Sequence, residues 1–414
     1  MFKLPQYTES KNFERHIKRD IKAKLHKILV RGSMPFFKEL DMELTNLGYT
    51  AQEVYGGFEI EGKIEDIYRI NLFSSTASRV FLMAGRFHAT AREQIFRRAV
   101  NIPWELYINP AIPIRIQTQL EKSPVSHEGE AERALRDAIS KRFEPLLEDS
   151  DIRLSFATED RTQIVQRILL IGIRNAAKVY IDTTGEHLAH RGYRTQHTGA
   201  PIKEHLAASC IIRLLKEEDM YPELPDRLFF LDPFCGSGTI LAEAGIILTG
   251  DAPGKNRRNL FEKLPWHQEK TWEYLKQNIE TRGLAATKIK LIGRDKDSDA
   301  VATAKANLTR AGLQDFSEIN SANFFSTEKS DLVPTRRKAI FLSNLPYGER
   351  IPAGKELYDR ILEHLAKKHH GLTGAFILPE DYNPKPVEGI ITSKIGRFSN
   401  GGIRVQLLMV KSIF

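Results

Sequence analysis

The sequence has few cysteines, no long apolar run and no apolar leader, and each absence excludes a class of protein. Only Cys210 and Cys235 occur among 414 residues, so a disulfide framework is excluded and a reducing cytoplasm is expected. No apolar stretch approaches the roughly 20 residues of a membrane span, and charges interrupt the N-terminus where a signal peptide needs an apolar core. With 41% apolar and 28% charged residues, the chain is expected to form two or three globular domains.

Two phosphate-binding patterns are also absent from the most distinctive stretch, Leu228–Thr239, which reads LFFLDPFCGSGT. The apolar run Leu228–Leu231 predicts a buried strand, which the proline of Asp232-Pro233 ends. Gly236-Ser237-Gly238 then allows a tight turn before a predicted helix. The third glycine of a dinucleotide fingerprint would stand at Leu241, and no Gly-Lys-Ser/Thr follows. The stretch therefore predicts a nucleotide-like ligand at a strand end, without the pattern for NAD or for a phosphate loop.

Positive charge is in mild excess, with 61 Lys and Arg against 53 Asp and Glu, which favours a polyanionic partner. Residues 1–30 hold eight Lys or Arg and three Asp or Glu. In this segment a spacing of four relates Phe13, Ile17, Ile21, Leu25 and Leu29, which predicts a basic amphipathic helix. The helix could dock on the body with its charged face in solvent or contact RNA, and a membrane surface is the less favoured alternative.

The N-terminal half is predicted to contain two α+β parts. Residues 30–90 show the order βαββαβ, with a hairpin turn at Gly56-Gly57, and this order is typical of a ferredoxin-like layer. Residues 91–184 continue with helices over Ala91–Val100 and Glu128–Phe143 and with strands over 112–117, 152–158, 164–171 and 176–182. The first helix carries the exposed candidates Arg97 and Arg98.

Residues 185–414 show strands separated by helices, with predicted strands over 228–231, 289–293, 318–325, 339–344 and 374–378. A closing hairpin is expected around Asn400-Gly401. This order predicts a mainly parallel, doubly wound sheet with an antiparallel end. An insertion over Gly250–Gly283, which contains FEKLPWHQ, is expected to line the substrate entrance or to cap the sheet.

Two further stretches carry chemistry. Asp295 ends the second strand, where a carboxylate can accept both hydroxyls of a ribose; alternatively, it is an acid favoured by a helix N-terminus. The loop Asn344-Leu345-Pro346-Tyr347 follows a buried strand. An exocyclic amine on a base is a poor nucleophile, and the Asn344 amide oxygen and the Leu345 carbonyl could each accept one of its N–H groups. Pro346 would stiffen the loop, and Tyr347 offers a flat face to an extruded base.

Other chemistry is disfavoured by the residues around these stretches. Four histidines between residues 187 and 205 lack a matching Cys, His or carboxylate cluster, so no metal is expected. A cytosine-C5 methyltransferase needs a thiolate in its catalytic loop, whereas Cys235 lies in the glycine turn and is interpreted as a small packed side chain.

These motifs resemble those of a known family. DPFCGSGT resembles the S-adenosylmethionine loop of class I methyltransferases that act on exocyclic amines, and NLPYG resembles their (N/D)PP(Y/F/W) loop in its RNA guanine-N2 form. The segment VYIDTTGEHLAHRGYR resembles the junction between a THUMP domain and a methyltransferase. The resemblance implies that Asp232 lies near the cofactor ammonium group and that Asn323, where the family usually has Asp, contacts the adenine.

The resemblance and the motifs together specify the site. The cofactor, S-adenosylmethionine, is expected at Asp232, Pro233, Phe234, Cys235, Gly236, Ser237, Gly238, Thr239, Asp295 and Asn323. The catalytic residues are expected to be Asn344, Leu345, Pro346 and Tyr347. The RNA substrate is expected to contact Arg97, Arg98, Arg191, Arg194, Gly348 and Arg350.

The predicted fold is α/β, a Rossmann-like class I methyltransferase sheet with a terminal antiparallel hairpin behind α+β ferredoxin-like and THUMP-like domains. The expected divisions are a basic amphipathic extension (1–29), a ferredoxin-like layer (30–90), a THUMP-like RNA-binding domain (91–184) and a methyltransferase domain (185–414). We expect a cytoplasmic enzyme that methylates guanine N2 in 23S ribosomal RNA. The alternatives are a transfer-RNA guanine-N2 enzyme, an adenine-N6 enzyme acting on DNA or RNA, and a non-catalytic RNA-binding assembly factor.

Overall fold

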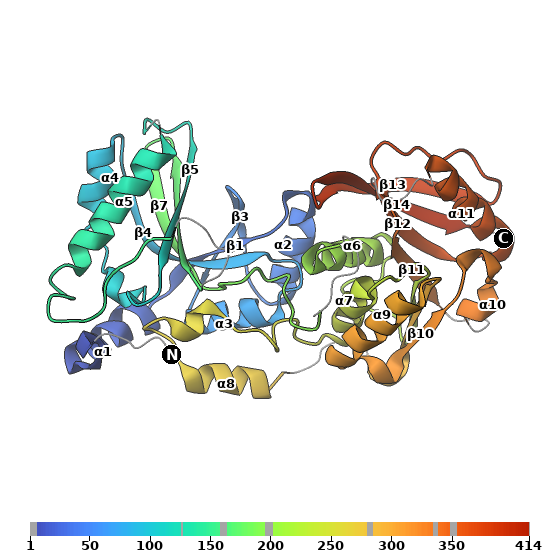
Figure 1. The fold of residues 1–414 in the computed structure, drawn as a ribbon, viewed down its shortest axis with the longest axis horizontal. Coiled ribbons are helices and arrows are strands. Elements are labelled where there is room, and N and C mark those ends of the chain that lie inside the picture. Colours follow the sequence, from blue (N-terminus) through green and yellow to red (C-terminus); the bar gives the residue numbers. More distant parts are fainter. Residues whose placement is uncertain are drawn as a thin grey trace.

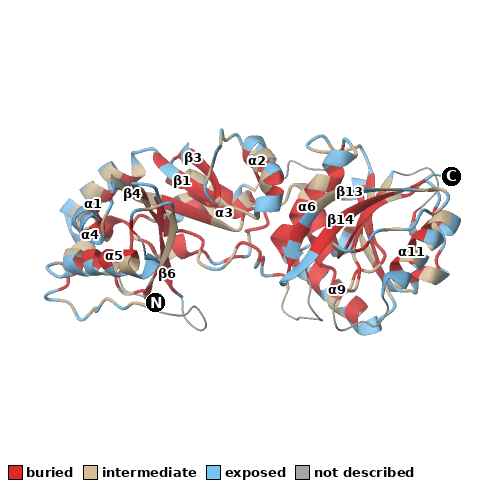
Figure 2. Cartoon of the chain, turned by 90° about the horizontal axis from the view of Figure 1, so that it is seen from above, coloured by how far each residue is buried: buried red, intermediate tan, exposed pale blue. Residues whose placement is uncertain are grey.

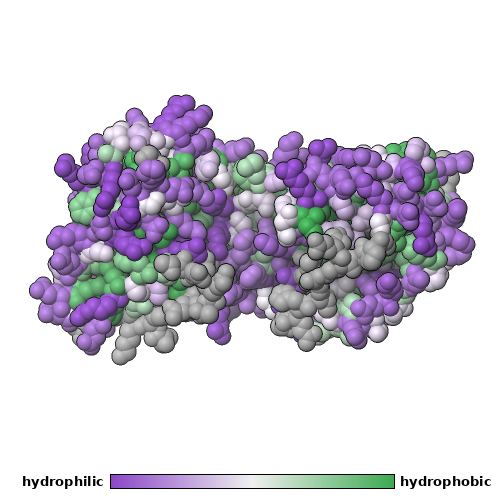
Figure 3. Space-filling model, turned by 45° about the horizontal axis from the view of Figure 1, so that its top comes forward, coloured by the Kyte–Doolittle hydropathy of each residue, from purple (hydrophilic) through white to green (hydrophobic). Residues whose placement is uncertain are grey.

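The computed structural model contains two seven-stranded sheets, which form two bodies side by side (Figure 1). It describes residues 6–125, 127–157, 164–194, 202–279, 285–333, 338–347 and 354–413. Figure 3 shows the bodies as two lobes with a mostly hydrophilic surface and a narrower waist between them. None of the described helices combines the length and the apolarity needed to cross a membrane.

The sheet of the first body has the order β2-β3-β1-β4-β7-β6-β5. Neighbouring strands are antiparallel, except for the parallel pair β5 and β6. The strands are β1 (His26–Arg31), β2 (Gln52–Val54), β3 (Gly57–Gly62), β4 (Arg79–His88), β5 (Ile114–Glu121), β6 (Gln166–Ile173) and β7 (Ala176–Asp182). Because β4 pairs with β7, the two α+β parts predicted from the sequence share one continuous sheet.

The helices of the first body are α1 (Lys11–His16), α2 (Phe37–Asn46), α3 (Ile64–Phe73), α4 (Arg92–Ala99) and α5 (Glu128–Phe143). The predicted N-terminal helix is shorter than expected. It continues from α1 only through a π-helical segment (Ile17–Lys22), after which the chain enters β1. Ile17 and Ile21 are buried in the core, whereas Leu25 is 59% exposed. The spacing of four does not correspond to a helix beyond Leu25, because Leu29 belongs to β1, a strand in the middle of the sheet.

One predicted strand of the first body is wrong. Among residues 152–157, which the structure describes, only an isolated bridge from Phe156 to Ile114 forms. The apolar side chains of this segment pack beside the core instead of pairing along a neighbouring strand.

The sheet of the second body has the order β10-β9-β8-β11-β12-β14-β13. Five strands are parallel, and β14 and β13 are antiparallel at one edge, which confirms the predicted doubly wound sheet with a closing hairpin. The strands are β8 (Leu228–Asp232), β9 (Ile289–Asp295), β10 (Ser317–Ser321), β11 (Ala339–Asn344), β12 (Thr373–Pro379), β13 (Ile390–Asn400) and β14 (Ile403–Ser412). The third predicted strand ends four residues early, at Ser321, because Asn323 caps a 3-10 turn.

Helices cover both faces of this sheet: α6 (Glu204–Glu217), α7 (Thr239–Thr249), α9 (Ser298–Arg310), α10 (Lys329–Leu332) and α11 (Lys355–Lys368). Side chains of β8 alternate between the two resulting cores. Leu228 and Phe230 pack with α6, α7 and α9, whereas Leu231 packs with α11. Figure 2 shows the central strands of both sheets as buried, whereas the edge strand β13 is mostly exposed or intermediate. Burial on both faces explains the continuous apolar run that the sequence shows here.

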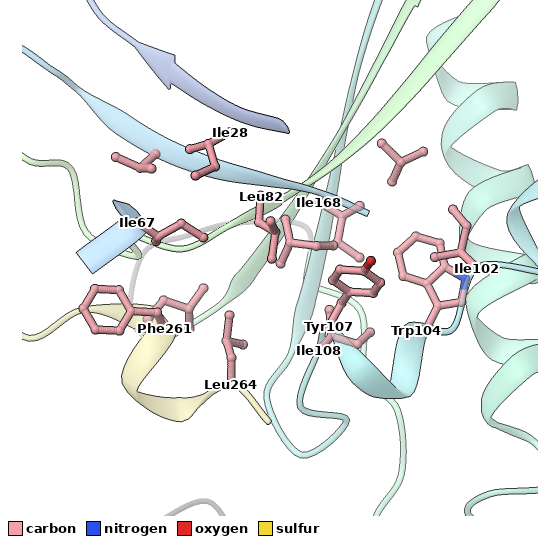
Figure 4. Packing of buried hydrophobic residues seen from close by; sticks show 14 of the residues in the cluster. Ile28, Ile67, Leu82, Ile102, Trp104, Tyr107, Ile108, Ile168, Phe261 and Leu264 are labelled. Carbon is pink, nitrogen blue, oxygen red and sulfur yellow. The ribbon is translucent and has the colours of Figure 1, made fainter. Parts of the chain in front are cut away.

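The described part of the insertion, residues 250–279, packs against the first body, although it lies between two strands of the second. Its helix α8 (Glu269–Gln277) lies beside α3 (Figure 1). Six of its apolar residues belong to the core of the first body: Ala252, Leu260, Phe261, Leu264, Trp266 and Trp272. Figure 4 shows Phe261 and Leu264 packed toward Ile67 and Leu82. The insertion therefore joins the two bodies rather than capping the second sheet.

Candidate active site

The glycine turn after β8 lies at the carboxyl end of the central parallel strands. Gly236 and Gly238 have positive φ angles of 49° and 79°. A Cβ on Gly238 would lie 3.0 Å from the Cβ of Ala304 and 3.1 Å from Leu308, so α9 packs directly on the turn. Only glycine meets both requirements, and helix α7 starts at the next residue.

Asp295 of β9 binds the turn from the neighbouring strand. Its Oδ2 accepts a hydrogen bond of 2.8 Å from the Gly236 N–H, and its Oδ1 accepts one of 3.0 Å from the Asp297 N–H. Each carboxylate oxygen has a second acceptor site, so ribose hydroxyls can still bind there. The assignment of Asp295 to a ribose stays a prediction, and its position beside the turn is compatible with it.

Asp232 is buried between the turn and the strand that leads to the catalytic loop. Its Oδ1 accepts a hydrogen bond of 2.5 Å from the Ser343 hydroxyl and one of 3.2 Å from the Phe234 N–H. Burial raises the pKa of this carboxyl to about 7, and the charge of Asp295 adds to the rise. A cationic group placed beside Asp232 would favour the ionised form. Ser343, which no motif in the sequence indicates, therefore links the glycine turn to the loop after β11.

The loop after β11 is held in place by backbone and hydroxyl contacts. The Leu345 N–H donates to the Ile377 carbonyl of β12 over 3.0 Å, and the Leu345 side chain is buried. The Tyr358 hydroxyl donates to the Pro346 carbonyl over 2.8 Å. Leu345 thus anchors the loop, which explains an apolar residue where the related motif commonly has proline.

Tyr347 contacts the β13–β14 hairpin. The Asn400 amide donates a hydrogen bond of 2.7 Å to the Tyr347 hydroxyl, and burial raises the pKa of this tyrosine. Its ring packs against the core beside α6. No sequence pattern predicts this contact, because 53 residues separate the two partners. The hairpin turn therefore positions the aromatic residue of the loop.

The amide oxygen of Asn344 is buried without any hydrogen-bond partner among the described residues. A buried acceptor left unpaired costs about 1–3 kcal/mol. Asn344 is the last residue of β11, which pairs with β8, the strand that ends at Asp232. The preceding residue, Ser343, donates a hydrogen bond to Asp232. The oxygen is thus ready to accept an N–H group from a bound molecule at the edge of the glycine turn.

Asn323 and Cys235 have local roles. The Asn323 side-chain oxygen already accepts from the Phe325 N–H over 3.1 Å, so an adenine amino group would share that oxygen. The Cys235 thiol is buried beside Gly293, and burial raises its pKa. A thiol in this state is a packing group rather than a nucleophile, in agreement with its interpretation from the sequence. Pro233, Ser237 and Thr239 are buried within the same turn.

The structure corrects two of the residues expected to contact RNA. Arg191 is 3% exposed, donates to the Ser75 and Leu188 carbonyls, and pairs with Glu243 over 3.2 Å. Arg194 is 12% exposed at its side chain and pairs with Glu204 over 3.2 Å. The positive charge of each arginine is neutralised by a buried carboxylate, so neither side chain is available to RNA.

Two of the remaining RNA candidates lie far from the site. Arg97 and Arg98 are exposed on α4, at the end of the first body away from the second (Figure 1). Gly348 and Arg350 lie outside the described residues. A contact of α4 with RNA stays a prediction and would require a substrate that spans both bodies.

Comparison with known proteins agrees with this architecture. Residues 191–387 match the family model described as "RMKL-like, methyltransferase domain", and residues 39–81 match the RlmL ferredoxin-like domain. A ribosomal RNA large subunit methyltransferase K/L from Allochromatium vinosum is 33% identical over 376 residues, which cover 88% of this chain and 49% of that protein. The protein of the same name from Syntrophotalea carbinolica is 32% identical over 88% of this chain and 51% of its own length. The chain thus spans about half the length of these curated relatives.

Solved structures share the whole arrangement of both bodies. The crystal structure of SMU.472 complexed with SAH is 26% identical, with a TM-score of 0.74 over 93% of this chain and 98% of that one. TrmN from Thermus thermophilus has the same fold, with 16% identity and a TM-score of 0.60 over 94% of this chain. The chain therefore contains an RMKL-like methyltransferase domain over residues 191–387, preceded by a segment, residues 39–81, that matches the RlmL ferredoxin-like domain.

Proposed function

We propose that this protein transfers a methyl group from S-adenosylmethionine to the exocyclic N2 amine of a guanine in large-subunit ribosomal RNA. The observation that carries the proposal is the amide oxygen of Asn344 at the edge of the glycine turn, which is buried and has no hydrogen-bond partner among the residues that the structure describes. The names of the curated relatives support ribosomal RNA as the substrate, and the bound SAH of SMU.472 supports the cofactor. Such a substrate also supports a cytoplasmic location.

The residues of the turn fit this cofactor. A methylsulfonium cofactor supplies an electrophilic methyl group when it is bound. The turn has the glycines that let a ligand approach the backbone. The N–H groups of Phe234, Cys235 and Gly236 already donate within the protein rather than forming a nest for phosphate. We propose that Asp232 receives the ammonium group, that Asp295 accepts the ribose hydroxyls and that Asn323 contacts the adenine. The raised pKa of Asp232 leaves that carboxyl ready to be charged by a cation.

The catalytic step then depends on positioning. Asn344 Oδ1 accepts one N–H of the guanine amine, which turns the nitrogen lone pair toward the transferred methyl group. The bound cofactor would supply the electrophilic methyl group, and the proton that the amine gives up would pass to solvent. Tyr347, held by Asn400, stacks on the extruded base. Alignment of this kind accounts for catalysis without an acid–base residue of strongly shifted pKa.

The N-terminal body would deliver the RNA in this proposal. Residues 91–184 are proposed to be a THUMP-like RNA-binding domain, with the ferredoxin-like layer over 30–90 beside it. The continuous sheet of the first body and the large area that the insertion buries would hold both at a fixed distance from the active site.

Replacing Asn344 with Ala tests the proposal. We expect methyl transfer to base-extracted ribosomal RNA from a strain lacking the gene to fall about 100-fold or more, with S-adenosylmethionine affinity nearly unchanged. Asn320→Ala, at an exposed asparagine of β10, is the matched control and should retain activity. Undiminished transfer by the Asn344→Ala protein would contradict the role of the amide oxygen.

A further inference from the structure

A pocket of about 540 Å³ opens where the first body, the connecting segment and the β13–β14 turn meet. Ser33 lines it from the first body, His187, Lys203 and His205 line it from the connecting segment and the start of α6, and Gly401 and Gly402 line it from the turn. No acidic residue is among the residues that line it. Figure 1 shows α6 between the two bodies, so the pocket belongs to their junction.

Hydrogen-bond donors and positive charge dominate this pocket. The His187 Nδ1 accepts from the Ala189 N–H over 3.1 Å, so the neutral ring carries its proton on Nε2. His205 is 4% exposed; its Nε2 lies 3.3 Å from the Ser33 hydroxyl, and its Nδ1 has no partner among the described residues. The two rings lie 4.7 Å apart. A buried, unpaired ring nitrogen is therefore part of the pocket wall.

Lys203 adds a cation at the N-terminus of α6. Lys203 is the N-cap residue, but its exposed side chain makes no capping hydrogen bond and no ion pair in the part of the chain that the structure describes. The adjacent carboxylate, Glu204, is paired with Arg194 instead. The positive end of the helix dipole and this ammonium group thus act on the same space.

The surroundings are positive as well. Burial lowers the pKa of His187 to about 3, and the nearby cations Arg79 and Lys203 lower it further. Burial also places the pKa of His205 well below its usual value. Both rings are therefore neutral donors near pH 7. They lie beside the Lys203 ammonium group, which no acidic residue of the pocket wall balances, whereas Arg79 is paired with Asp182 over 2.6 Å. A ligand with negative charge and several acceptor oxygens complements this chemistry.

The pocket adjoins the catalytic loop. Gly401 and Gly402 have positive φ, and a Cβ at either would meet nothing within 4 Å, so the turn leaves open space on the pocket side. Asn400, in the same turn, holds the Tyr347 hydroxyl. β14 pairs antiparallel to β12 with Val405 opposite Pro379, which brings the turn to the carboxyl edge of the parallel strands. Strand β11 ends with Asn344 at that same edge.

We propose that this pocket binds a backbone phosphate of the RNA strand that carries the target base. This inference rests on the proposed function. The phosphate oxygens accept from Lys203 and from the imidazole N–H groups, and the strand is held between the first body and the catalytic loop. Lys203 is then a positioning residue: it fixes where the target nucleotide enters rather than contacting the reacting atoms.

Lys203→Gln tests the pocket, with Lys203→Arg as the conservative variant and Lys216→Gln, at an exposed lysine near the other end of α6, as the matched control. The probe is 23S ribosomal RNA from a strain lacking the gene, and filter binding is measured over a series of KCl concentrations. Loss of one phosphate contact should weaken binding roughly threefold to tenfold and reduce the slope of log affinity against log salt by about 0.7–0.9. In the Lys203→Gln protein the KM for RNA should rise, whereas kcat and the affinity for S-adenosylmethionine should not change. The Lys203→Arg protein should retain most of the RNA binding.

Two outcomes would overturn the pocket assignment. One is a Lys203→Gln protein with the RNA affinity and salt slope of the Lys216→Gln protein. The other is calorimetric binding of inorganic phosphate that Lys203→Gln abolishes while RNA binding stays intact, which would identify a site for a free anion. Failure of the proposed function gives a different result: the wild-type protein would form no N2-methylguanosine, whereas the salt slopes would still report on the pocket.

Discussion

Asp232 and Asn344 end two adjacent strands, and each side chain is held in an unusual state without a ligand. Asp232 is buried with its pKa raised to about 7, and the Asn344 oxygen is buried without a partner in the described part of the chain. Both costs are relieved if the ammonium group of a cofactor lies beside Asp232 and an amine lies beside Asn344. The binding of the ammonium group and the binding of the amine can therefore be tested separately, by substituting Asp232 or Asn344.

The affinity for S-adenosylmethionine should depend on pH through Asp232. Below pH 7 the free protein carries a protonated Asp232, and binding of a cation must release that proton, so affinity should fall as pH decreases, by at most about tenfold per unit. Above pH 7 the affinity should be constant. Asp232→Asn should bind more weakly at pH 8 and lose this dependence, and Asp226→Asn, at an exposed acid, serves as control. Calorimetry at several pH values checks this, and a flat wild-type profile would contradict it.

The turn between β8 and α7 shows how an element depends on its neighbours. Asp232-Pro233 and the two glycines can be recognised in the sequence, but the reason for Gly238 comes from α9, whose Ala304 and Leu308 leave no room for a Cβ. Asn307 of α9 also donates to the Ser237 carbonyl over 2.8 Å. The turn is thus shaped by a helix some 60 residues further along the sequence, which a local pattern does not reveal.

Gly238→Ala and Gly312→Ala separate backbone strain from packing. Both glycines have similar φ angles, 79° and 77°, but a Cβ on Gly312 meets nothing within 4 Å. Each substitution should lose roughly 1–2 kcal/mol of unfolding free energy from the left-handed backbone. Gly238→Ala should lose about 1–3 kcal/mol more by overpacking against α9. Urea unfolding measures both values, and equal losses would show that α9 does not constrain the turn.

At the scale of the whole molecule, the insertion over 250–283 joins the two bodies. Trp272 is 1% exposed in the core of the first body, whereas Tyr274, two residues further along α8, is 65% exposed. Trp272→Ala should therefore reduce the unfolding free energy by about 3–5 kcal/mol, and Tyr274→Ala by less than about 0.5 kcal/mol. Urea denaturation of the full chain tests this difference. Similar losses for both variants would contradict the docking of the insertion.

The sequence predicted most elements and the mainly parallel, doubly wound type of the second sheet with its closing hairpin, because apolar periodicity and glycine turns are local properties. Helix α5 and strands β7 and β11 were predicted with their observed bounds. The sequence did not predict the continuous sheet of the first body, the burial of Arg191, or the bond from Asn400 to Tyr347. Each of these depends on residues distant in the chain, and charge alone cannot distinguish an arginine that binds RNA from one that neutralises a buried glutamate.

The central claim is that this molecule methylates the N2 amine of guanine in large-subunit ribosomal RNA. The most direct measurement is mass spectrometry of nucleosides from 23S ribosomal RNA of a strain lacking the gene, after incubation with the full chain and labelled S-adenosylmethionine. We predict labelled N2-methylguanosine from the wild-type protein and none from the Asn344→Ala protein. Labelled N6-methyladenosine in place of N2-methylguanosine, or no labelled nucleoside at all, would contradict the claim.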